Sequence, residues 1–369
     1  MKKLFFIAIA AAVTLAACQK TEVNTPEQVI NFKVANRVQT KATTGSEYTN
    51  GAFGTYAWFN GTNEFMVNEK VDKSGSEWTT VDHTFYWPKT GSIDFISYSP
   101  FNGTSDTPGT VPAVTANSIV YSGYTAADVD LMYADKVTCA SESGANLDEI
   151  NDGIDSGFTG VPTLFRHALA KLAFKIRANF VEYDDPANGS HTEWEVTVNS
   201  AKISGFKTTG SCTLNWASGA WEKPVTTVDG VDYNVWTGLS GASADQELIS
   251  TPVVLTTTAQ DIAPANGFVM PQVLEDGAQI LALDFHIKTT LSNGKTIEED
   301  ITKTVDIKAI SSLKAWQMNE NIVYTISIKP TAKANGPSGQ DDTPEDVVIT
   351  FDPAVAEWTN VDASASIQL

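Results

Sequence analysis

The chain has 369 residues, a formal net charge of −20 and a pI of about 4.5. This charge disfavours nucleic acid as a partner, because phosphate groups bind clustered lysines and arginines. The length predicts two domains, and 42% of the residues are hydrophobic, which is enough for sizeable cores. Only 18% are charged, and the abundance of Thr, Ser, Asn and Gly favours short strands and tight turns over long helices.

Residues 1–17 have the pattern of a signal peptide. Two lysines precede an apolar stretch, Leu4–Leu15, that is too short to span a bilayer as a helix. The small residues before Cys18 resemble a bacterial lipoprotein motif, in which this cysteine becomes the acylated N-terminus. The alternative is an ordinary secretory signal followed by an incidental cysteine. Residues 18–28 are predicted to form a flexible tether, in which the polar stretch 19–28 reaches at most about 35 Å when extended.

The first strand of the exported chain is predicted within Val29–Lys41. Ile30, Phe32 and Val34 lie on one face of an alternating pattern, and the residues between them are polar. This period of two is typical of a half-buried strand.

Two basic residues, Arg37 and Lys41, follow the alternating pattern in a polar run, 36–44, that has no apolar periodicity. We expect this run to be accessible to proteases of the trypsin type. The first strand therefore lies between a membrane anchor and a cleavable segment. The functional interpretation depends on whether that strand is permanent or removable.

Short strands separated by turn residues are predicted along the rest of the chain, which indicates an all-β fold of two β-sandwich domains. Asn293-Gly294 is the strongest hairpin signal and predicts antiparallel pairing of Ile280–Thr289 with Ile301–Ile307, with Phe285 buried. A short helix is predicted over Ser311–Trp316. The other strands are predicted at residues 51–60, 82–87, 93–98, 118–121, 131–134, 164–181, 194–204, 211–216, 221–225, 233–236, 248–255, 267–270, 321–328 and 347–351. Within 164–181 the alternation covers 172–180, and an irregular start is predicted at Arg166-His167.

Residues 141–160 form an acidic segment with several glycines, and a domain boundary is predicted here. It divides the chain into an N-terminal sandwich domain, 29–160, and a C-terminal one, 161–369, to within about 20 residues. The spacing of the acidic residues does not match a calcium-binding EF-hand loop. The segment is therefore interpreted as a solvated loop.

No sequence motif for catalysis or for a cofactor is present. The chain has no nucleophile elbow, phosphate-binding loop or dinucleotide fingerprint. Its four histidines, His83, His167, His191 and His286, are too far apart in sequence to form a metal-binding pair. His167 is predicted to pack at the start of a strand. The sequence thus predicts neither catalytic nor metal-ligating residues, and the protein is not expected to be an enzyme.

Nine tryptophans raise the alternative of a glycan-binding protein, because aromatic faces stack on sugars. Trp78 and Trp221 lie near loops and are the candidate platforms. Core packing is expected instead for the tryptophans in strand-like runs, Trp58, Trp87, Trp194 and Trp236.

Cys139 and Cys212 remain after the signal peptide. Export makes a disulfide between them possible. Because nothing in the sequence indicates that they lie close in space, two unpaired buried thiols are the favoured interpretation.

The order of segments resembles the fimbrillin family, the lipoprotein subunits of type V pili. The resemblance covers nearly the whole chain. The segments that carry it are Cys18, Ile30-x-Phe32, the basic residues Arg37 and Lys41, Phe53–Trp58, Tyr86-Trp87-Pro88 with Phe95–Pro100, Phe165–Leu172, Met270-Pro271-Gln272, Trp316–Tyr324 and Phe351–Trp358.

The resemblance implies two tandem transthyretin-like β-sandwich domains and export to the outer membrane as a lipoprotein. It also implies that a protease cuts after a basic residue, removes the first strand and opens a groove for a strand of a neighbouring fimbrial subunit. Lys41 has the family's Thr-x-Ala context, whereas Arg37 suits an Arg-specific protease. The C-terminal run, Val347–Leu369, is the expected donor. The resulting fimbria would act in adhesion to a host or microbial surface ligand.

The alternative function is a surface-anchored, glycan-binding lipoprotein that keeps its first strand and does not polymerise.

Overall fold

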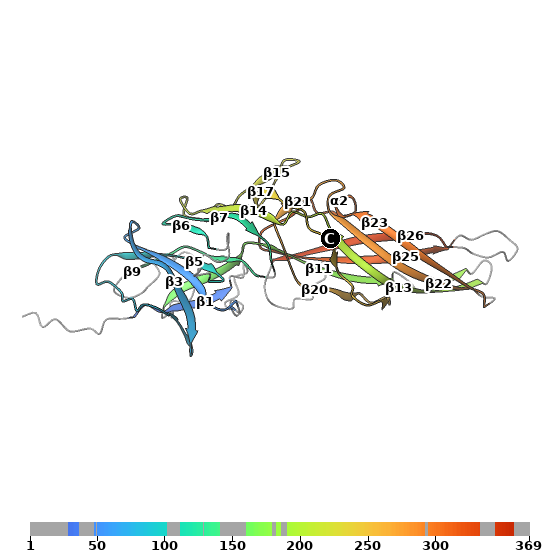
Figure 1. The fold of residues 1–369 in the computed structure, drawn as a ribbon, viewed down its shortest axis with the longest axis horizontal. Helices are drawn as coiled ribbons and strands as arrows, with labels where there is room; N and C mark the ends of the chain where they lie inside the picture. Colours follow the sequence, from blue (N-terminus) through green and yellow to red (C-terminus); the bar gives the residue numbers. More distant parts are fainter. Residues whose placement is uncertain are drawn as a thin grey trace, which may run out of the picture.

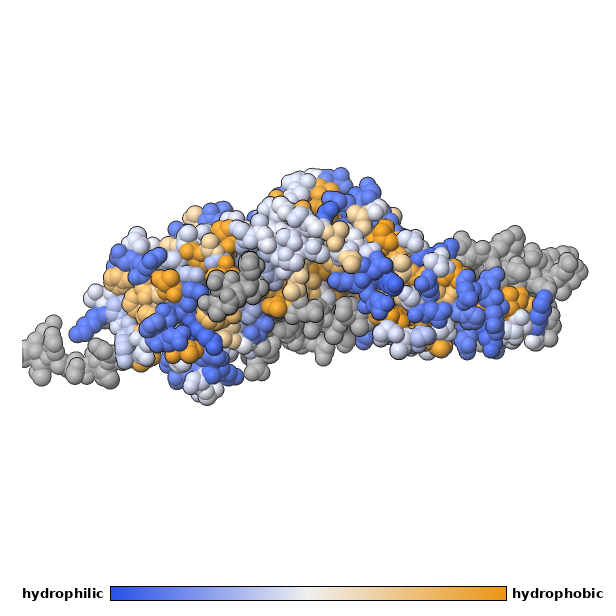
Figure 2. All heavy atoms as spheres, viewed as in Figure 1, coloured by the Kyte–Doolittle hydropathy of each residue, from blue (hydrophilic) through white to orange (hydrophobic). Residues whose placement is uncertain are grey.

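The computed structural model describes residues 29–36, 48, 50–101, 111–127, 129–140, 160–178, 182–185, 190–291, 294–332 and 344–357. The molecule is elongated and consists almost entirely of strands, so the predicted all-β class is confirmed (Figure 1). On the face shown in Figure 2, hydrophobic residues lie in small separate groups among hydrophilic ones. In the described part of the chain, no helix is both long enough and apolar enough to cross a membrane.

The N-terminal half is built on one sheet in the order β2-β3-β4-β1-β10-β8-β5-β9. Because β5 also pairs with β2, these strands form a closed ring, which we call the N-terminal ring, with β9 beside β8 along β5. Its strands are β1 (Phe32–Asn36), β2 (Phe53–Phe59), β3 (Asn63–Ser74), β4 (Glu77–Thr80), β5 (Ser92–Ser99), β8 (Met132–Ala134), β9 (Val137–Ala140) and β10 (Val161–His167).

A second sheet, β17-β14-β7-β6, packs against the outside of the ring through a shared apolar cluster that includes Trp58, Ile96, Tyr121 and Leu214. This second sheet contains strands from both sides of the domain boundary predicted at residue 160. The boundary itself stays a prediction. The strands are β6 (Ala113–Thr115), β7 (Ser118–Thr125), β14 (Thr209–Asn215) and β17 (Thr237–Ser240).

The C-terminal half contains two further sheets that share one core, which includes Phe174, Val196, Phe285 and Ile326. One sheet has the order β20-β11-β25-β26, with β11 (Ala170–Ala178), β20 (Gln260–Val269), β25 (Glu320–Ala332) and β26 (Pro344–Glu357). The other has the order β12-β13-β22-β23, with β12 (Glu182–Asp185), β13 (Ser190–Ser204), β22 (Ile280–Leu291) and β23 (Thr296–Asp306).

Short elements complete this half. Two small strands, β18 (Gln246–Glu247) and β19 (Val253–Val254), pair with β13. Separate two-stranded pairs are β15 (Thr226–Val228) with β16 (Val231–Tyr233), and β21 (Gln272–Val273) with β24 (Ala315–Trp316). The tandem sandwich and transthyretin-like descriptions stay predictions.

The hairpin predicted around Asn293-Gly294 is confirmed. β22 and β23 pair antiparallel, Phe285 lies opposite Ile301, and its side chain is 1% exposed. Gly294 has a φ of 79°, and its amide donates to the carbonyl of Leu291 (2.8 Å). Asn293 itself lies outside the described residues.

Several predicted elements were wrong. The helix is α2 (Ile307–Ile310), one turn before the predicted Ser311–Trp316, because the Asp306 carboxylate caps its start by accepting from the amide of Lys308. Residues 82–87 and 221–225 contribute only isolated bridges. Strands β3 and β4 were missed. In β3 the buried residues Met66 and Val71 are an odd number of positions apart, because the strand is irregular: its register with β2 shifts and Asn68 has a φ of 49°.

The segment before residue 172, predicted as an irregular strand start, contains a separate strand, β10. It is followed by β11 after a break at Ala168 and Leu169. Both residues of the break are fully buried, because the chain passes there from the ring into the C-terminal sheets. Alternation cannot reveal such a crossing, since consecutive side chains are buried.

Candidate functional site: the first strand and its walls

Strand β1 lies between two neighbours in the N-terminal ring. It pairs in parallel with β10 over five residue pairs, from Phe32 opposite Val161 to Asn36 opposite Phe165. On its other side, Phe32 pairs antiparallel with Trp78 of β4. A removed β1 would therefore leave unpaired backbone groups on both sides of the ring.

The chain just before β1 is held in the same place. The amide of Ile30 donates to the carbonyl of Phe85 (2.9 Å), and Val29 forms a bridge with Tyr86. The carbonyl of Asn31 accepts a hydrogen bond from the amide of Val161 (2.7 Å). We call β1, these preceding residues and the segments that contact them the β1 site.

The side chains of the β1 site alternate between the core and the surface. Ile30 and Phe32 are buried, Val34 is half-buried, and Lys33 is exposed. The ring of Phe32 lies edge-on to Phe53 (5.7 Å between centroids) and to Phe95 (5.8 Å). Such pairs contribute beyond the area they bury. The role of these residues in strand exchange stays a prediction.

Gly160 allows β10 to approach β1 closely. Its φ is 128°, and a Cβ at this position would lie 3.0 Å from the carbonyl oxygen of Asn31. Both the backbone angle and the contact favour glycine.

Tyr48 is a part of the β1 site that sequence reasoning missed. Its ring is buried, stacks on Phe165 of β10 (4.8 Å) and lies against Trp78 of β4 (5.4 Å). Its hydroxyl hydrogen-bonds to the hydroxyl of Ser99. Burial raises the pKa of Tyr48 well above the usual value for tyrosine. Tyr48 lies outside any alternating pattern, so the sequence carries no signal for its burial.

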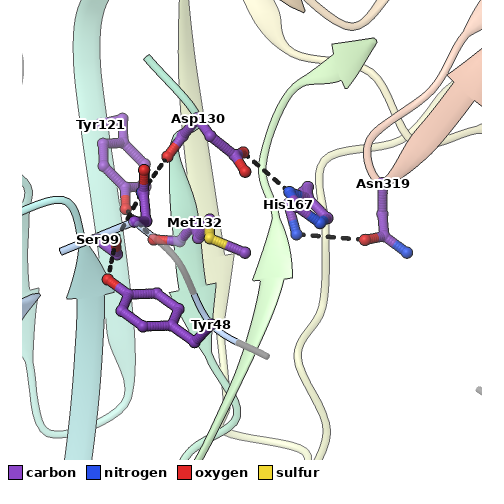
Figure 3. A network of polar contacts seen from close by, with 8 residues as sticks. Tyr48, Ser99, Tyr121, Asp130, Met132, His167 and Asn319 are labelled. Carbon is purple, nitrogen blue, oxygen red and sulfur yellow. Dashed lines mark hydrogen bonds and ion pairs between the residues drawn. The ribbon is translucent and has the colours of Figure 1, made fainter. Parts of the chain in front are cut away.

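A polar network connects the part of the β1 site around Tyr48 and Ser99 to the C-terminal half (Figure 3). The Asn50 amide donates to Ser99 Oγ (2.8 Å) and to the carbonyl of Asp130 (2.7 Å). The Asp130 carboxylate contacts His167 Nδ1 (2.8 Å), and the backbone amide of His167 donates to Asn319 Oδ1 (3.2 Å). The network thus runs from Ser99 in β5 to the turn before β25.

His167, expected at a strand start, lies at the end of β10, where the chain leaves the ring. The next residue, Ala168, accepts from the indole of Trp236 (2.8 Å) and donates to the carbonyl of Leu131 (2.7 Å). The backbone amide of Asn319 donates to the carbonyl of Leu169 (3.0 Å). These contacts fix the passage between the two halves and give His167 a structural role.

The candidate sugar platforms pack against the protein. Trp78 is half-buried against Phe53 and Tyr48. Trp221 is also half-buried, and its indole donates to the carbonyl of Ala134 (3.0 Å) and lies edge-on to Trp216. The expected core packing is seen for Trp58, Trp194 and Trp236, which are buried, and Trp87 is half-buried.

Cys139 and Cys212 are both buried and do not form a disulfide with each other, as the sequence favoured. Cys18, Arg37 and Lys41 lie outside the described residues. Among the residues that are described, no three His, Cys, Asp or Glu side chains come together as a metal site.

A family model described as fimbrillin-like matches residues 40–358. The chain belongs to the fimbrillin-like family. This is a family of fimbrial and adhesion-type structural proteins, so the chain is a subunit of this kind at the cell surface, and it is not an enzyme. No curated protein matches the chain.

Several solved structures are similar to this chain, with low sequence identity and TM-scores below 0.5. A candidate cell adhesion protein from Bacteroides uniformis is 18% identical, with a TM-score of 0.45, covering 91% of this chain and 99% of that one. One from Parabacteroides distasonis is 13% identical (TM-score 0.37, 89% and 96% covered). The fimbrial anchor protein Mfa2 from Porphyromonas gingivalis is 12% identical (TM-score 0.26, 90% and 98% covered).

Proposed function

We propose that this fimbrillin-like chain is exported as an outer-membrane lipoprotein, acylated at Cys18, and becomes a subunit of a type V pilus by strand exchange. A protease cuts after Arg37 or Lys41, β1 leaves its site, and a strand of a neighbouring subunit takes its place. The observation that carries this proposal is the position of β1 between β4 and β10, with both candidate cut sites in the segment that follows it.

Loss of β1 exposes a site that is unstable when empty. The amide of Val161 and the carbonyl of Phe85 lose their partners, and the aromatic side chains around Phe32 become accessible to water. An open edge with an apolar floor recruits an extended strand by β-augmentation. The free energy of filling the site therefore favours assembly.

The C-terminal strand of a second copy has a sequence suited to this site. In β26, Ile349-Thr350-Phe351 repeats the apolar pattern of Ile30-Asn31-Phe32. Strand β26 lies at the edge of its own sheet, where it pairs with β25. An edge strand separates from its sheet by breaking one ladder, whereas an inner strand breaks two.

Limited trypsin digestion tests this proposal. We expect N-terminal sequencing to find cuts after Arg37 or Lys41, and size-exclusion chromatography to show polymers of the cut chain. Phe351→Ala should reduce polymer formation more than the neighbouring Thr350→Ala, because only Phe351 is apolar. A cut chain that remains a stable monomer would refute strand exchange, and an uncut folded chain would refute removal of β1.

Lipidation is tested separately. A palmitate analogue supplied to cells should label the wild-type chain and not Cys18→Ala. Equal labelling of both chains would contradict acylation at Cys18.

A further inference from the structure

Tyr48 lies beyond the candidate cut sites in sequence, yet its ring forms part of the wall of the β1 site. It contacts Phe165 of β10 and Trp78 of β4, the two strands between which β1 lies. A cut after Arg37 or Lys41 leaves Tyr48 on the main body of the chain. Its ring would therefore remain in place when β1 leaves.

We propose that Tyr48 is a positioning residue that closes one end of the β1 site, so that the site accepts a strand with three inward apolar side chains and excludes a fourth. This inference rests on the proposed strand exchange and adds a rule for the incoming strand. The three inward positions are those of Ile30, Phe32 and Val34.

The register between β1 and β10 supports this limit. Phe32 lies opposite Val161, and residue 36 lies opposite Phe165. Paired residues on neighbouring strands direct their side chains to the same face of the sheet. The backbone at the fourth position of the pattern, residue 36, thus lies beside Phe165, and the ring of Tyr48 stacks on this phenylalanine (4.8 Å, 23° between planes).

A hydrogen bond connects Tyr48 to parts of the N-terminal ring other than β1. Its hydroxyl is bound to Ser99 of β5, which also accepts from Asn50. Asn50 in turn is bound to Asp130, whose carboxylate contacts His167 at the end of β10. None of these groups belongs to β1, so the network persists after β1 is released.

A strand-exchange assay with synthetic peptides tests the inference. Residues 42–45 of the full chain are replaced by the recognition sequence of a specific protease, so that the chain is cut whether or not Arg37 and Lys41 are natural sites. The cut chain then exchanges β1 for a fluorescent peptide of residues 29–36. Fluorescence anisotropy gives the relative affinities of variant peptides.

Peptides that differ at single inward positions measure how many apolar side chains the site takes. We expect Val34→Ser to weaken binding by about fivefold, because a half-buried apolar side chain is lost. We expect Asn36→Leu to give no gain over the native peptide. Lys33→Leu adds an equal apolar group on the exposed face and controls for general hydrophobicity.

Removal of the Tyr48 ring should allow the site to take a fourth inward apolar side chain. On a Tyr48→Ala chain, the Asn36→Leu peptide should bind about tenfold more tightly than the native peptide, since leucine fills the vacated space. Tyr48→Phe keeps the ring and should keep the wild-type preference. Val67→Ala, which removes an exposed apolar side chain of β3 outside the β1 site, is the control and should also keep it.

Two results would contradict the proposed role of Tyr48. One is tighter binding of the Asn36→Leu peptide than of the native peptide on the wild-type chain, and the other is no such gain on a folded Tyr48→Ala chain. If Tyr48→Ala fails to fold, the wild-type and Tyr48→Phe chains still test the proposal. Tighter binding of the Asn36→Leu peptide than of the native peptide to either chain would contradict the limit of three inward apolar side chains. Failure of the proposed function is distinct, because there no β1 peptide, native or variant, exchanges into the cut chain.

Discussion

Phe32 occupies the middle of the β1 site, where two aromatic rings meet it edge-on. Phe32→Ala should destabilise the N-terminal ring by about 3–5 kcal/mol, since it removes a buried ring and leaves a cavity. Chemical denaturation with a probe in the ring would measure this change. Lys33→Ala, at an exposed neighbouring position, is the control and should change little. A loss below about 1 kcal/mol for Phe32→Ala would show that the site relaxes around the missing ring.

His83 reports a local electrostatic effect at the surface of the same half. Its hydrogen bond to the Glu69 carboxylate (3.0 Å), together with the charge of that carboxylate, raises the pKa of His83. Stability from this pair is fully present below the ordinary pKa of histidine and is lost as the pH rises through the raised value. We expect Glu69→Gln to lower the pKa of His83, measured by NMR titration, and Glu64→Gln to leave it unchanged. An unchanged pKa in Glu69→Gln would exclude this partner in solution.

At the scale of single residues, the sequence predicts what depends on neighbours along the chain. The burial of Ile30 and Phe32 followed from alternation, because a strand directs successive side chains to opposite faces. The burial of Tyr48 did not, because it depends on Phe165 and Trp78, which are distant in sequence. Likewise Trp78 and Trp221 were expected near the surface, and contacts with distant residues keep them half-buried.

At the scale of elements, the close approach of β1 and β10 depends on Gly160. Gly160→Ala should destabilise the ring by about 1–3 kcal/mol, because it combines backbone strain with a contact at the Asn31 carbonyl. Gly75→Ala is the control, since Gly75 also has a positive φ but a Cβ there would meet nothing within 4 Å. Denaturation should show the larger loss for Gly160→Ala. Equal losses would mean that the contact with β1 adds nothing to the backbone strain.

The β22–β23 hairpin gives a prediction that is independent of the β1 site. Phe285 is buried in the core between the two C-terminal sheets, so Phe285→Ala should cost about 3–5 kcal/mol of stability. Asp284→Ala, at the exposed adjacent position, should cost far less. Thermal unfolding of both variants measures the difference. Similar losses would mean that side-chain burial does not govern the stability of this hairpin.

The sequence predicted elements well where apolar alternation and a turn signal coincide. For β22 and β23, the Asn-Gly turn and the alternating residues point to one register. Strand β3 was missed because its two buried residues, Met66 and Val71, are an odd number of positions apart, which breaks the period of two. The break between β10 and β11 was missed as a change of sheet, because burial on both sides of the chain erases the alternation.

At the scale of the whole molecule, the two halves are connected by pairings between distant segments. Strand β7 pairs with β14, and β10 continues into β11 through the buried residues Ala168 and Leu169. No periodic pattern encodes such pairings, so the sequence predicted that the chain forms strands but not how these strands pair. The core around β1 and the cluster between the ring and the second sheet lie on opposite faces of the ring strands, since Phe95 of β5 belongs to the first and its neighbour Ile96 to the second.

The two buried cysteines lie in these two different regions. The labelling rate of each thiol therefore measures how accessible its own region becomes when β1 is removed. Cys139 belongs to the core that contains Ile30 and Phe32, whereas Cys212 belongs to the cluster between the ring and the second sheet. Burial raises the pKa of the Cys212 thiol, which keeps it protonated and unreactive. In a Cys18→Ala chain, we expect neither thiol to react with a maleimide while β1 is in place.

After a cut in the segment that follows β1 and removal of the strand, Cys139 should be labelled at least about tenfold faster than Cys212, because the opening is confined to the β1 core. Mass spectrometry of the labelled peptides measures both rates, and Cys139→Ser identifies the signal. Readdition of the synthetic β1 peptide should protect Cys139 again. Equal labelling of the two cysteines would mean that loss of β1 unfolds the whole N-terminal half, which would leave no defined site for the strand of another subunit.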